Sequence, residues 1–523
     1  MKKLYLLLVL TFIARLAQGQ NFFRSELPTT VSVPWEISYG PDGYLWLTEK
    51  NGVVSRVHPT TGAKQMVYTA TDYFPGSPLE NNSRCHNPPI GAGTLGLALH
   101  PDFLSPANSY LYFVYSYNSG TAQTPATKFR IKRLQWDALK DTVVNDTNIV
   151  NSIPSGFDHW GGRLLAVKRN GNSHLFLTVG DLGISEINAP DCYSPQSSNP
   201  NNFTQDINTM NGKIHRFNMD GSIPNDNPVN GNSFYTRGHR NPQGLIYNPN
   251  ADVLYDVEHG DRTDDEINIL YKGMNYGWKN VRGYHGDNNH PGEATYIANY
   301  TPNPAVPGDS LVPALYSWCD TLANTNGNFN DWCTVAPSDG IYYGSSGITQ
   351  WTNSLLVVTL KDGSTTDREV YRFQLLANGK IAPSTPTEPN PSRFFGADQQ
   401  LNGRLRDLTF SPDGRTLYLI NNGGATDKIT VYELDTTDIS LPDVSLDHPL
   451  SLYPNPAKNQ LIIESGNRDE NPSEVQLTNL QGVSQSLPLK GNTIDISWLS
   501  PGLYFVRVRY KDRWHSARFI KHP

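Results

Sequence analysis

Residues 35–49 read "WEISYGPDGYLWLTE", in which a short alternating apolar run and a Pro-Asp-Gly turn precede a second run rich in aromatic and branched residues. Two such runs joined by a glycine-containing turn are typical of a β-hairpin. The phrase returns with variations farther along the chain. The five further copies occupy residues 95–116, 163–181, 243–261, 340–363 and 406–422.

Most copies are followed by a further strand-like run, such as "KIHRFNM" or "EVYRFQL", so each repeat predicts an antiparallel sheet of three or four strands. Repetition of such a unit without a helix in each repeat is typical of a β-propeller, whose radial packing protects the sheet edges. We therefore expect an all-β chain with a six-bladed β-propeller over residues 22–436. A β-sandwich with hairpins that are similar by chance is the alternative, because Pro-Asp-Gly turns are common in β proteins.

Residues 1–19 have the pattern of a signal peptide. Lys2 and Lys3 precede an apolar run, and Ala17-Gln18-Gly19 has the small-x-small form of a cleavage site. The apolar run is too short to span a bilayer comfortably, and no later run approaches the length needed. We therefore expect an exported protein without a transmembrane helix.

Two segments follow the predicted propeller. Residues 437–448 are polar and contain proline, which predicts a linker. Residues 449–523 contain short runs that alternate apolar and polar residues, as in "LYPNPAKNQLIIES" and "GLYFVRVR". This alternation predicts a small β-sandwich domain.

Export permits disulfides, and the chain has four cysteines. Cys319 and Cys333 bracket a loop rich in Gly, Asn and Asp, which favours a local pair and leaves Cys85 with Cys192. The sequence leaves the other pairings open. Since no two cysteines form a CxxC motif, we expect structural roles rather than metal binding or redox chemistry.

The net charge of -7 and the absence of a long Lys/Arg run predict no nucleic-acid partner and favour a small ligand. In a propeller, loops from different blades meet at one end of the axis, so polar residues next to the repeats come together. Those residues are His159, Asp181, Arg240, Asn241, Lys361, Arg404 and Arg406. Four cations aimed at one axis predict an anionic ligand or cofactor.

Among these residues, His159 and Asp181 suit proton abstraction. A carboxylate on one imidazole nitrogen fixes the tautomer and leaves the other nitrogen to accept a proton. The alternative for His159 is a hydrogen-bonded loop histidine. Arg240 and Lys361 have equally simple alternatives, an ion pair in a turn and the corner of a hairpin.

The run "HGDRTDDE" at residues 259–266 is a candidate cation site. Asp264, Asp265 and Glu266, with nearby carbonyl groups, offer the oxygen ligands that Ca²⁺ prefers. The run lacks the ligand spacing of an EF-hand loop. A solvated acidic turn is therefore the alternative.

From about residue 30 to 435 the sequence resembles the soluble PQQ-dependent glucose/sorbosone (aldose sugar) dehydrogenases. The resemblance rests on the ordered motifs "GTLGLALHPDF", "HWGGRLL", "LTVGDLG", "NGKIHRFNMDGSIPNDNP", "YTRGHRNPQGL", "DDEINILYKGMNYGW", "LLVVTLKDG" and "RLRDLTFSPDG". It implies a six-bladed propeller that binds pyrroloquinoline quinone (PQQ) and calcium at its axis.

The resemblance also implies roles for the polar residues. His159 would be the base that takes the proton from the anomeric hydroxyl, with Asp181 supporting it, while hydride passes to the quinone. Arg240 would polarise the reactive quinone carbonyl. The other residues that hold the cofactor would be Asn241, Lys361, Arg404 and Arg406.

For the metal, the resemblance implies an active-site calcium on the backbone carbonyls of Gly260 and Asp261, and a second calcium on Glu266 and the backbone near Tyr276. Asp261 stands where the glucose enzymes have proline, which backbone ligation tolerates. Gly91 stands where they have a substrate-contacting glutamine, so the resemblance does not imply glucose itself.

The phrases "LYPNPAKNQL", "LTNLQG" and "LSPGLYFVRV" resemble the C-terminal sorting domain of the type IX secretion system in Bacteroidota. That resemblance implies the secretion machinery as a partner and a secreted or cell-surface location. Altogether we predict a secreted quinoprotein that oxidises an aldose to its lactone and passes electrons to an external acceptor. A calcium-dependent propeller lactonase and a non-catalytic carbohydrate- or protein-binding propeller are the alternatives.

Overall fold

The computed structural model describes residues 22–76, 93–155, 159–182, 203–261, 263–286, 291–318, 334–361, 368–386, 388–396, 403–422, 427–435, 450–464, 472–479, 484–488, 491–510 and 513–522. The predicted signal peptide and linker, the four cysteines and Gly91 lie outside these residues. Two compact units divide the chain, one of them Phe23–Glu433 and the other containing Leu434–Pro523.

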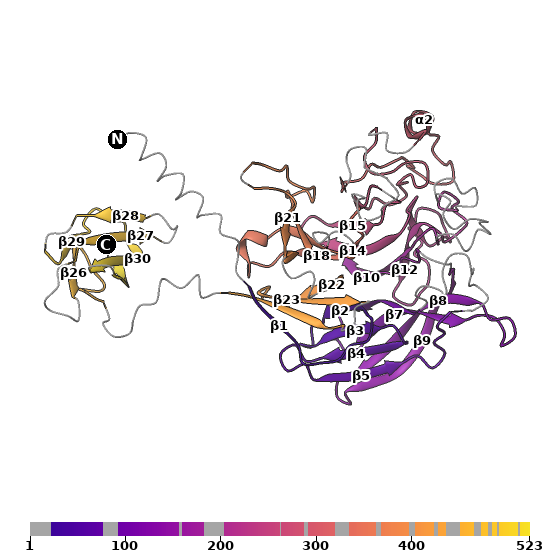
Figure 1. Cartoon of the computed structure of the whole chain (residues 1–523), viewed down its shortest axis with the longest axis horizontal. Helices are drawn as coiled ribbons and strands as arrows, with labels where there is room; N and C mark the ends of the chain where they lie inside the picture. The colour runs from indigo at the N-terminus through magenta and orange to yellow at the C-terminus, as the bar shows by residue number, and fades with distance from the viewer. Residues whose placement is uncertain are drawn as a thin grey trace. The chain divides into compact units, whose positions relative to one another are not determined.

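In the larger unit, five four-stranded sheets follow the order of the chain, and each strand pairs antiparallel with the next (Figure 1). These sheets consist of β2 (Pro34–Tyr39), β3 (Leu45–Glu49), β4 (Val53–Val57) and β5 (Lys64–Thr69); β6 (Thr94–Leu99), β7 (Tyr110–Asn118), β8 (Thr127–Asp137) and β9 (Thr142–Ile153); β10 (Leu164–Arg169), β11 (Asn172–Val179), β12 (Lys213–Asn218) and β13 (Phe234–Arg237); β14 (Pro242–Asn248), β15 (Val253–Glu258), β16 (Glu266–Ile269) and β17 (Tyr316–Ser317); and β18 (Pro337–Tyr343), β19 (Ser354–Thr359), β20 (Val370–Gln374) and β21 (Ser392–Phe394).

A sixth sheet joins the two ends of this unit. Its strands, in spatial order, are β1 (Phe22–Glu26), β24 (Ile429–Leu434), β23 (Thr416–Asn422) and β22 (Arg404–Phe410). The first strand of the unit, indigo in Figure 1, therefore lies in the same sheet as the orange strands from its end. Just after β1, the Leu27 backbone N–H donates to the Ile429 carbonyl at 3.0 Å.

The first strands of the six sheets form a closed ring. In order around the ring they are β2, β6, β10, β14, β18 and β22, and β22 contacts β2 again. Residues of these strands line a cavity of about 600 Å³ along the ring axis. Polar residues at the ends of different first strands therefore lie near one another although they are far apart in sequence.

Local turn chemistry explains the first hairpin. Gly43 has a φ of 85°, which few residues other than glycine adopt, and its N–H donates to the Gly40 carbonyl at 3.0 Å. The turn sets the register in which Tyr39 faces Leu45 across β2 and β3. The Pro-Asp-Gly phrase of the sequence thus produces a hairpin as predicted.

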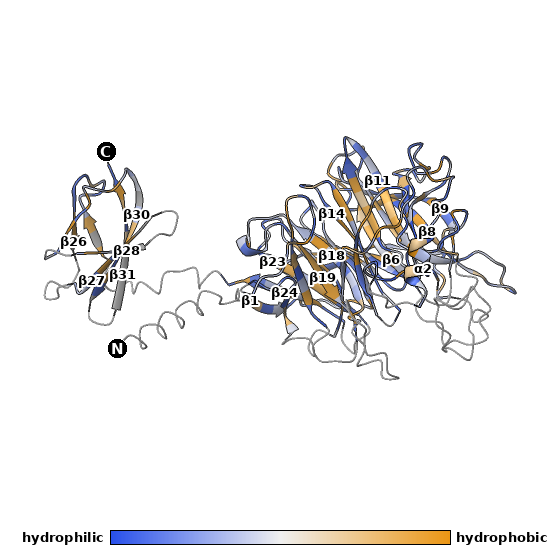
Figure 2. Ribbon diagram, turned by 90° about the horizontal axis from the view of Figure 1, so that it is seen from above, coloured by the Kyte–Doolittle hydropathy of each residue, from blue (hydrophilic) through white to orange (hydrophobic). Residues whose placement is uncertain are grey.

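Apolar side chains from neighbouring sheets pack against each other. One buried cluster joins Trp46 and Val54 of the first sheet to Phe113 of the second, and another joins Leu175 of the third sheet to Tyr112 of the second. Figure 2 shows apolar residues, in orange, along the strands of these sheets. Each fully buried side chain of this size contributes about 1.5–3 kcal/mol relative to exposure, so the contacts between sheets stabilise the ring.

Helix is rare in the described residues. It comprises α2 (Glu293–Ala298) and the 3₁₀ turn η5 (Thr349–Trp351). The prediction of an all-β chain is therefore confirmed. Neither of these helical segments has the length and apolar composition needed to cross a membrane.

The smaller unit contains two sheets, with spatial orders β25-β26-β29 and β28-β27-β30-β31. Their strands are β25 (Ser451–Tyr453), β26 (Gln460–Glu464), β27 (Glu474–Asn479), β28 (Ser484–Leu487), β29 (Thr493–Asp495), β30 (Gly502–Tyr510) and β31 (Arg513–Lys521). One buried cluster contains Leu461 and Ile494 from the first sheet and Val475 and Val506 from the second. The two sheets thus share one apolar core.

Candidate active site

His159 and Asp181 lie together at one end of the third sheet, before β10 and after β11. His159 Nδ1 is 2.7 Å from Asp181 Oδ1, and Trp278 Nε1 donates to Asp181 Oδ2 at 2.9 Å. Asp181 is 1% exposed and His159 is 7% exposed. Because the carboxylate holds a proton on Nδ1, the ring is fixed in the tautomer that carries its lone pair on Nε2.

Backbone contacts fix this pair beside Arg240. The Asp181 N–H donates to the Arg240 carbonyl at 2.7 Å, and His159 has a left-handed φ of 54°. Gly180 permits the approach, since a Cβ at this position would lie 2.0 Å from the His159 carbonyl oxygen and 2.9 Å from that of Arg240. The glycine of the motif "LTVGDLG" is thus required by packing.

Arg240 is held by three elements of the site. Its backbone N–H donates to Glu258 Oε2 at 3.0 Å, and its Nη1 donates to the His259 carbonyl at 3.2 Å. Its guanidinium lies 5.6 Å from the Trp278 ring and 3.9 Å from Asp261 Oδ1. The structure therefore brings Arg240 together with the predicted catalytic pair and the predicted calcium ligand Asp261.

Gln243 connects two of the predicted cofactor-binding residues. Its Nε2 donates to Asn241 Oδ1 at 2.8 Å, and its Oε1 accepts from Arg406 Nη2 at 2.9 Å. Asn241 Nδ2 in turn lies 3.3 Å from His259 Nδ1. Asn241 and Arg406, from different sheets, thus face the same region.

Lys361 and Arg404 differ in exposure. Lys361 follows β19 and is 2% exposed, and its N–H donates to the Val335 carbonyl at 3.2 Å. Arg404 is exposed at the start of β22. Burial first, then the charges of Arg163 and Arg404, holds the pKa of Arg406 well below its usual range. Arg404 lies two residues before Arg406 on β22.

The donor set fits an anionic cofactor. Within the described part of the chain, Arg240 Nε, Arg406 Nε and His259 Nε2 are buried without a hydrogen-bond partner. Buried unsatisfied donors are costly, and guanidinium groups satisfy them best with carboxylates. Burial and the charge of Arg240 also hold the pKa of His259 well below its usual range, so its ring is neutral. PQQ, with its carboxylates and ring oxygens, matches these groups.

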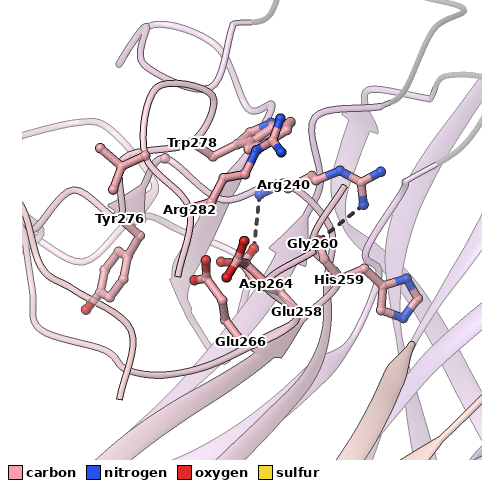
Figure 3. A pocket seen from close by; sticks show the side chains of 11 residues that line it. Arg240, Glu258, His259, Gly260, Asp264, Glu266, Tyr276, Trp278 and Arg282 are labelled. Carbon is pink, nitrogen blue, oxygen red and sulfur yellow. Dashed lines mark hydrogen bonds between the residues drawn. The ribbon is translucent and has the colours of Figure 1, made fainter. Parts of the chain in front are cut away.

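A cavity of about 10 Å³, which suits a single water molecule or ion, is lined by four of the residues predicted to bind calcium, namely Gly260, Asp264, Glu266 and Tyr276. Figure 3 shows the carboxylates of Glu258, Asp264 and Glu266 gathered on one side of it, with Gly260 beside them. Burial and the mutual repulsion of the two glutamates raise the pKa of Glu266 well above its usual range. A divalent cation would relieve that repulsion, so the oxygen-rich wall fits calcium.

The individual members of the acidic run have different partners. Asp261 Oδ2 accepts from Arg282 Nη2 at 3.1 Å, which leaves only its backbone carbonyl in the predicted role. Glu266 accepts from the Gly283 N–H at 2.5 Å. The Asp265 carboxylate accepts backbone N–H groups from Gly260, Val335 and Ala336 at 2.6–2.9 Å. The Asp265 oxygens are thus engaged by backbone N–H groups from two segments of the chain, and its role as a metal ligand stays a prediction.

The second predicted calcium position involves Tyr276. Tyr276 is 4% exposed, and its phenol oxygen accepts the Tyr271 N–H at 2.9 Å and donates to the Ile269 carbonyl. Its side chain is thereby anchored in the fourth sheet. Tyr276 lines the same cavity as Glu266, which brings the two predicted positions together.

A buried layer of charged residues centred on Arg163 lies on the axis and was not predicted from the sequence. Arg163 Nη1 lies 2.5 Å from Glu36 Oε2 and 3.4 Å from Asp407 Oδ2, and its Nε lies 3.0 Å from Asp339 Oδ2. Burial raises the pKa of Glu36 and of Asp339 to about 7. Each residue occupies an equivalent place, at the start of a repeat, so an alignment of the repeats would have found them.

Trp278 and His259 were also missed. Trp278 ends the motif "DDEINILYKGMNYGW", and His259 directly precedes Gly260 and Asp261. Their position beside residues with predicted roles was the only sign in the sequence that they belong to the site. The contacts of Trp278 with Asp181 and of His259 with Asn241 appear only in the folded structure.

Comparison with known proteins agrees with this geometry. The family described as "Glucose / Sorbosone dehydrogenase" matches residues 31–430, and "Secretion system C-terminal sorting domain" matches residues 451–522. Quinoprotein glucose dehydrogenase B of Acinetobacter calcoaceticus is 32% identical over 458 residues, which cover 78% of this chain and 86% of that protein. An aldose sugar dehydrogenase of Escherichia coli is 25% identical, covering 77% of this chain and 93% of that protein.

Two solved structures share the fold. The PQQ-bound aldose sugar dehydrogenase from Streptomyces coelicolor has a TM-score of 0.53 at 23% identity, covering 80% of this chain and 100% of that one. The apo-form of the soluble aldose sugar dehydrogenase from Escherichia coli has a TM-score of 0.56 at 22% identity, covering 79% and 100%. Since the family match spans 400 of the 523 residues (31 through 430), the chain belongs to the glucose/sorbosone dehydrogenase family and ends in a secretion sorting domain.

Proposed function

We propose that the chain is a secreted, PQQ-dependent dehydrogenase that oxidises the anomeric carbon of an aldose to a lactone. The observation that supports it most is the contact of the His159–Asp181 pair with Arg240, beside a set of buried cations. A proton acceptor next to an anion site is what this oxidation requires. A binding protein would have no need of the oriented base.

The residues divide between proton transfer and cofactor binding. His159 Nε2 takes the proton of the anomeric hydroxyl, and Asp181 holds the ring and stabilises the imidazolium that results. When bound, PQQ supplies the hydride acceptor. Arg240 would polarise the reactive carbonyl of the bound cofactor. The residues that hold its carboxylates and ring oxygens are Asn241, Lys361, Arg404 and Arg406.

Calcium completes the site. The carbonyls of Gly260 and Asp261 bind the active-site ion, and Glu266 with the backbone of Tyr276 binds a second one that stabilises the loop. The cavity lined by Gly260, Glu266 and Tyr276 supports this assignment. An external acceptor would take up the electrons.

The remaining assignments concern the architecture. The closed ring of first strands supports a six-bladed propeller over residues 22–436, preceded by a signal peptide at 1–19. Residues 437–448 are a linker, and 449–523 are a β-sandwich sorting domain that engages type IX secretion machinery. Secretion to the medium or the cell surface of a Bacteroidota-type bacterium follows from that domain.

The proposal is tested by titrating the purified, chelator-treated chain with PQQ and Ca²⁺ while dye reduction is followed across a panel of aldoses. We expect saturable activity that depends on both additions. Tight PQQ binding without turnover on any aldose would reject the proposed reaction. Absence of PQQ binding by correctly folded protein would reject the cofactor and favour a binding propeller.

A further inference from the structure

A second group of metal-ligand side chains lies behind the turn that carries Arg240. His239 directly precedes Arg240, and Asp256 and Glu258 are two residues apart on β15, so their side chains share one face of the strand. His239 and Asp256 are fully buried, and Glu258 is 4% exposed. Burying two carboxylates is costly unless a cation compensates them.

The spacing of the ligand atoms fits a metal better than hydrogen bonds. His239 Nδ1 lies 3.3 Å from Asp256 Oδ2 and 3.4 Å from Glu258 Oε1. Charge-assisted hydrogen bonds are shorter, about 2.7–2.9 Å. Four-coordinate zinc has bonds of about 2.0–2.1 Å, which place neighbouring ligand atoms about 3.3–3.4 Å apart. One ligand atom from each of the three residues lies within 4.8 Å of the others.

Unsatisfied oxygens around the group also point to a cation. In the described part of the chain, Asp256 Oδ1 and Oδ2 and Asn268 Oδ1 are buried without a hydrogen-bond donor. Asn268 faces Asp256 across β15 and β16, and its Nδ2 donates to Glu258 Oε1 at 3.1 Å. Buried acceptors of this kind are rare in folded proteins and call for a missing donor, water or ion.

The histidine ring is already oriented for ligation. Its Nε2 is 2.9 Å from Thr236 Oγ1, so the hydroxyl can accept the Nε2 proton and leave the Nδ1 lone pair toward the carboxylates. The ring also stacks on Tyr276, with centroids 4.7 Å apart. Both contacts fix Nδ1 in place without any contribution from the carboxylates.

We propose that His239, Asp256 and Glu258 bind a divalent transition metal of the zinc type, with Asn268 Oδ1 or a water molecule as the fourth ligand. One imidazole nitrogen with two carboxylates suits zinc, whereas calcium prefers oxygen ligands alone. The position shares the Glu258 carboxylate with the cavity proposed for calcium, but His239 and Asp256 do not line that cavity. Without a metal, Glu258 and Asp256 raise the pKa of His239 to about 10, so an imidazolium paired with two carboxylates is the competing state.

The bound metal would stabilise the turn that carries Arg240. Glu258 offers Oε1 to the metal while its Oε2 accepts the Arg240 N–H at 3.0 Å, the dashed contact in Figure 3. The Glu258 carboxylate therefore connects the metal directly to the backbone of Arg240. It takes no part in the proposed oxidation, so its presence can be tested without measuring activity.

The test uses the full chain, treated with chelator, saturated with Ca²⁺ and titrated with Co²⁺ alone, and separately with Zn²⁺ alone. We expect one Co²⁺ per chain with the intense visible absorption of a four-coordinate site, displaced by Zn²⁺ but not by further Ca²⁺. The variants His239→Gln and Asp256→Asn should lose this absorption.

His215→Gln is the matched control. His215 is also buried, but Ser233 Oγ at 2.9 Å and the Met210 carbonyl at 3.0 Å occupy its two nitrogens, so this variant should keep the signal. Folded wild-type protein that takes up no Co²⁺ would overturn the proposal and leave the imidazolium state. An absorption that survives in Asp256→Asn would overturn it as well. The wild-type titration decides the matter even where a variant fails to fold.

Discussion

Asp181→Asn tests whether the carboxylate fixes the tautomer of His159. Both oxygens of Asp181 accept hydrogen bonds, from His159 at 2.7 Å and from Trp278 at 2.9 Å. An amide has one acceptor and one donor end. If its oxygen stays with the indole, its NH₂ faces His159 Nδ1, which can then only accept, and the ring proton moves to Nε2.

With its proton on Nε2, His159 can no longer act as a base. General-base catalysis contributes on the order of 100- to 10,000-fold, so we expect kcat to fall by that factor, equivalent to about 2.7–5.4 kcal/mol. Asp181 meets Arg240 through the backbone, because its N–H donates to the Arg240 carbonyl. PQQ affinity, measured on the apo-protein by fluorescence, should therefore stay within about threefold of the wild type.

The double variant Trp278→Phe/Asp181→Asn separates the tautomer from the lost charge. Without the indole donor, the amide can turn its oxygen toward His159 Nδ1 and restore the active tautomer. We expect kcat to rise at least about tenfold above Asp181→Asn, with Trp278→Phe alone as the reference. A double variant no faster than the single one, or an Asp181→Asn enzyme near the wild-type rate, would refute the tautomer argument.

Three further predictions concern packing, charge and domain independence. Gly180→Ala should lower kcat/KM at least about tenfold, since its Cβ would lie 2.0 Å from the His159 carbonyl, and steady-state kinetics with a PQQ-binding control measure this. Burial raises the pKa of Glu36 to about 7, so the free energy of unfolding falls as pH rises from about 4.5 to 7. Glu36→Gln should reduce this pH-dependent decrease in the free energy of unfolding by up to about 3 kcal/mol, as measured by denaturant titrations between pH 5 and 8. Removing residues 449–523 should leave kcat and the Tm of the Phe23–Glu433 unit unchanged in thermal scans.

The repeating hairpins were predictable because their determinants are local. Alternating apolar residues and a Pro-Asp-Gly turn specify a hairpin wherever they occur, as the left-handed Gly43 shows. The order of the strands in five sheets then follows the order of the chain. The pairing of β1 with β24 has no local signal, because nothing in residues 22–26 says which sheet they complete.

The candidate site was predictable only in part. His159, Asp181 and Arg240 stand next to repeated phrases, so their convergence follows from a propeller. The contact of Gln243 with Arg406 depends on how β14 and β22 are placed across the ring. The two residues are 163 positions apart, so no local sequence pattern predicts that they meet. Asp265 was predicted as a metal ligand from its residue type, which cannot reveal that the N–H groups of Gly260, Val335 and Ala336 bind its carboxylate.

The axial layer distinguishes the charge of Arg163 from that of Arg406. Trp35 lies between two guanidiniums, with Arg163 at 4.0 Å and Arg406 at 4.2 Å from its ring centroid. Three carboxylates surround Arg163, including Glu36, and compensate its charge. No carboxylate in the described residues forms an ion pair with Arg406. The carboxylates therefore pair with Arg163, so the charge of Arg406 is available to an anionic ligand such as the proposed cofactor.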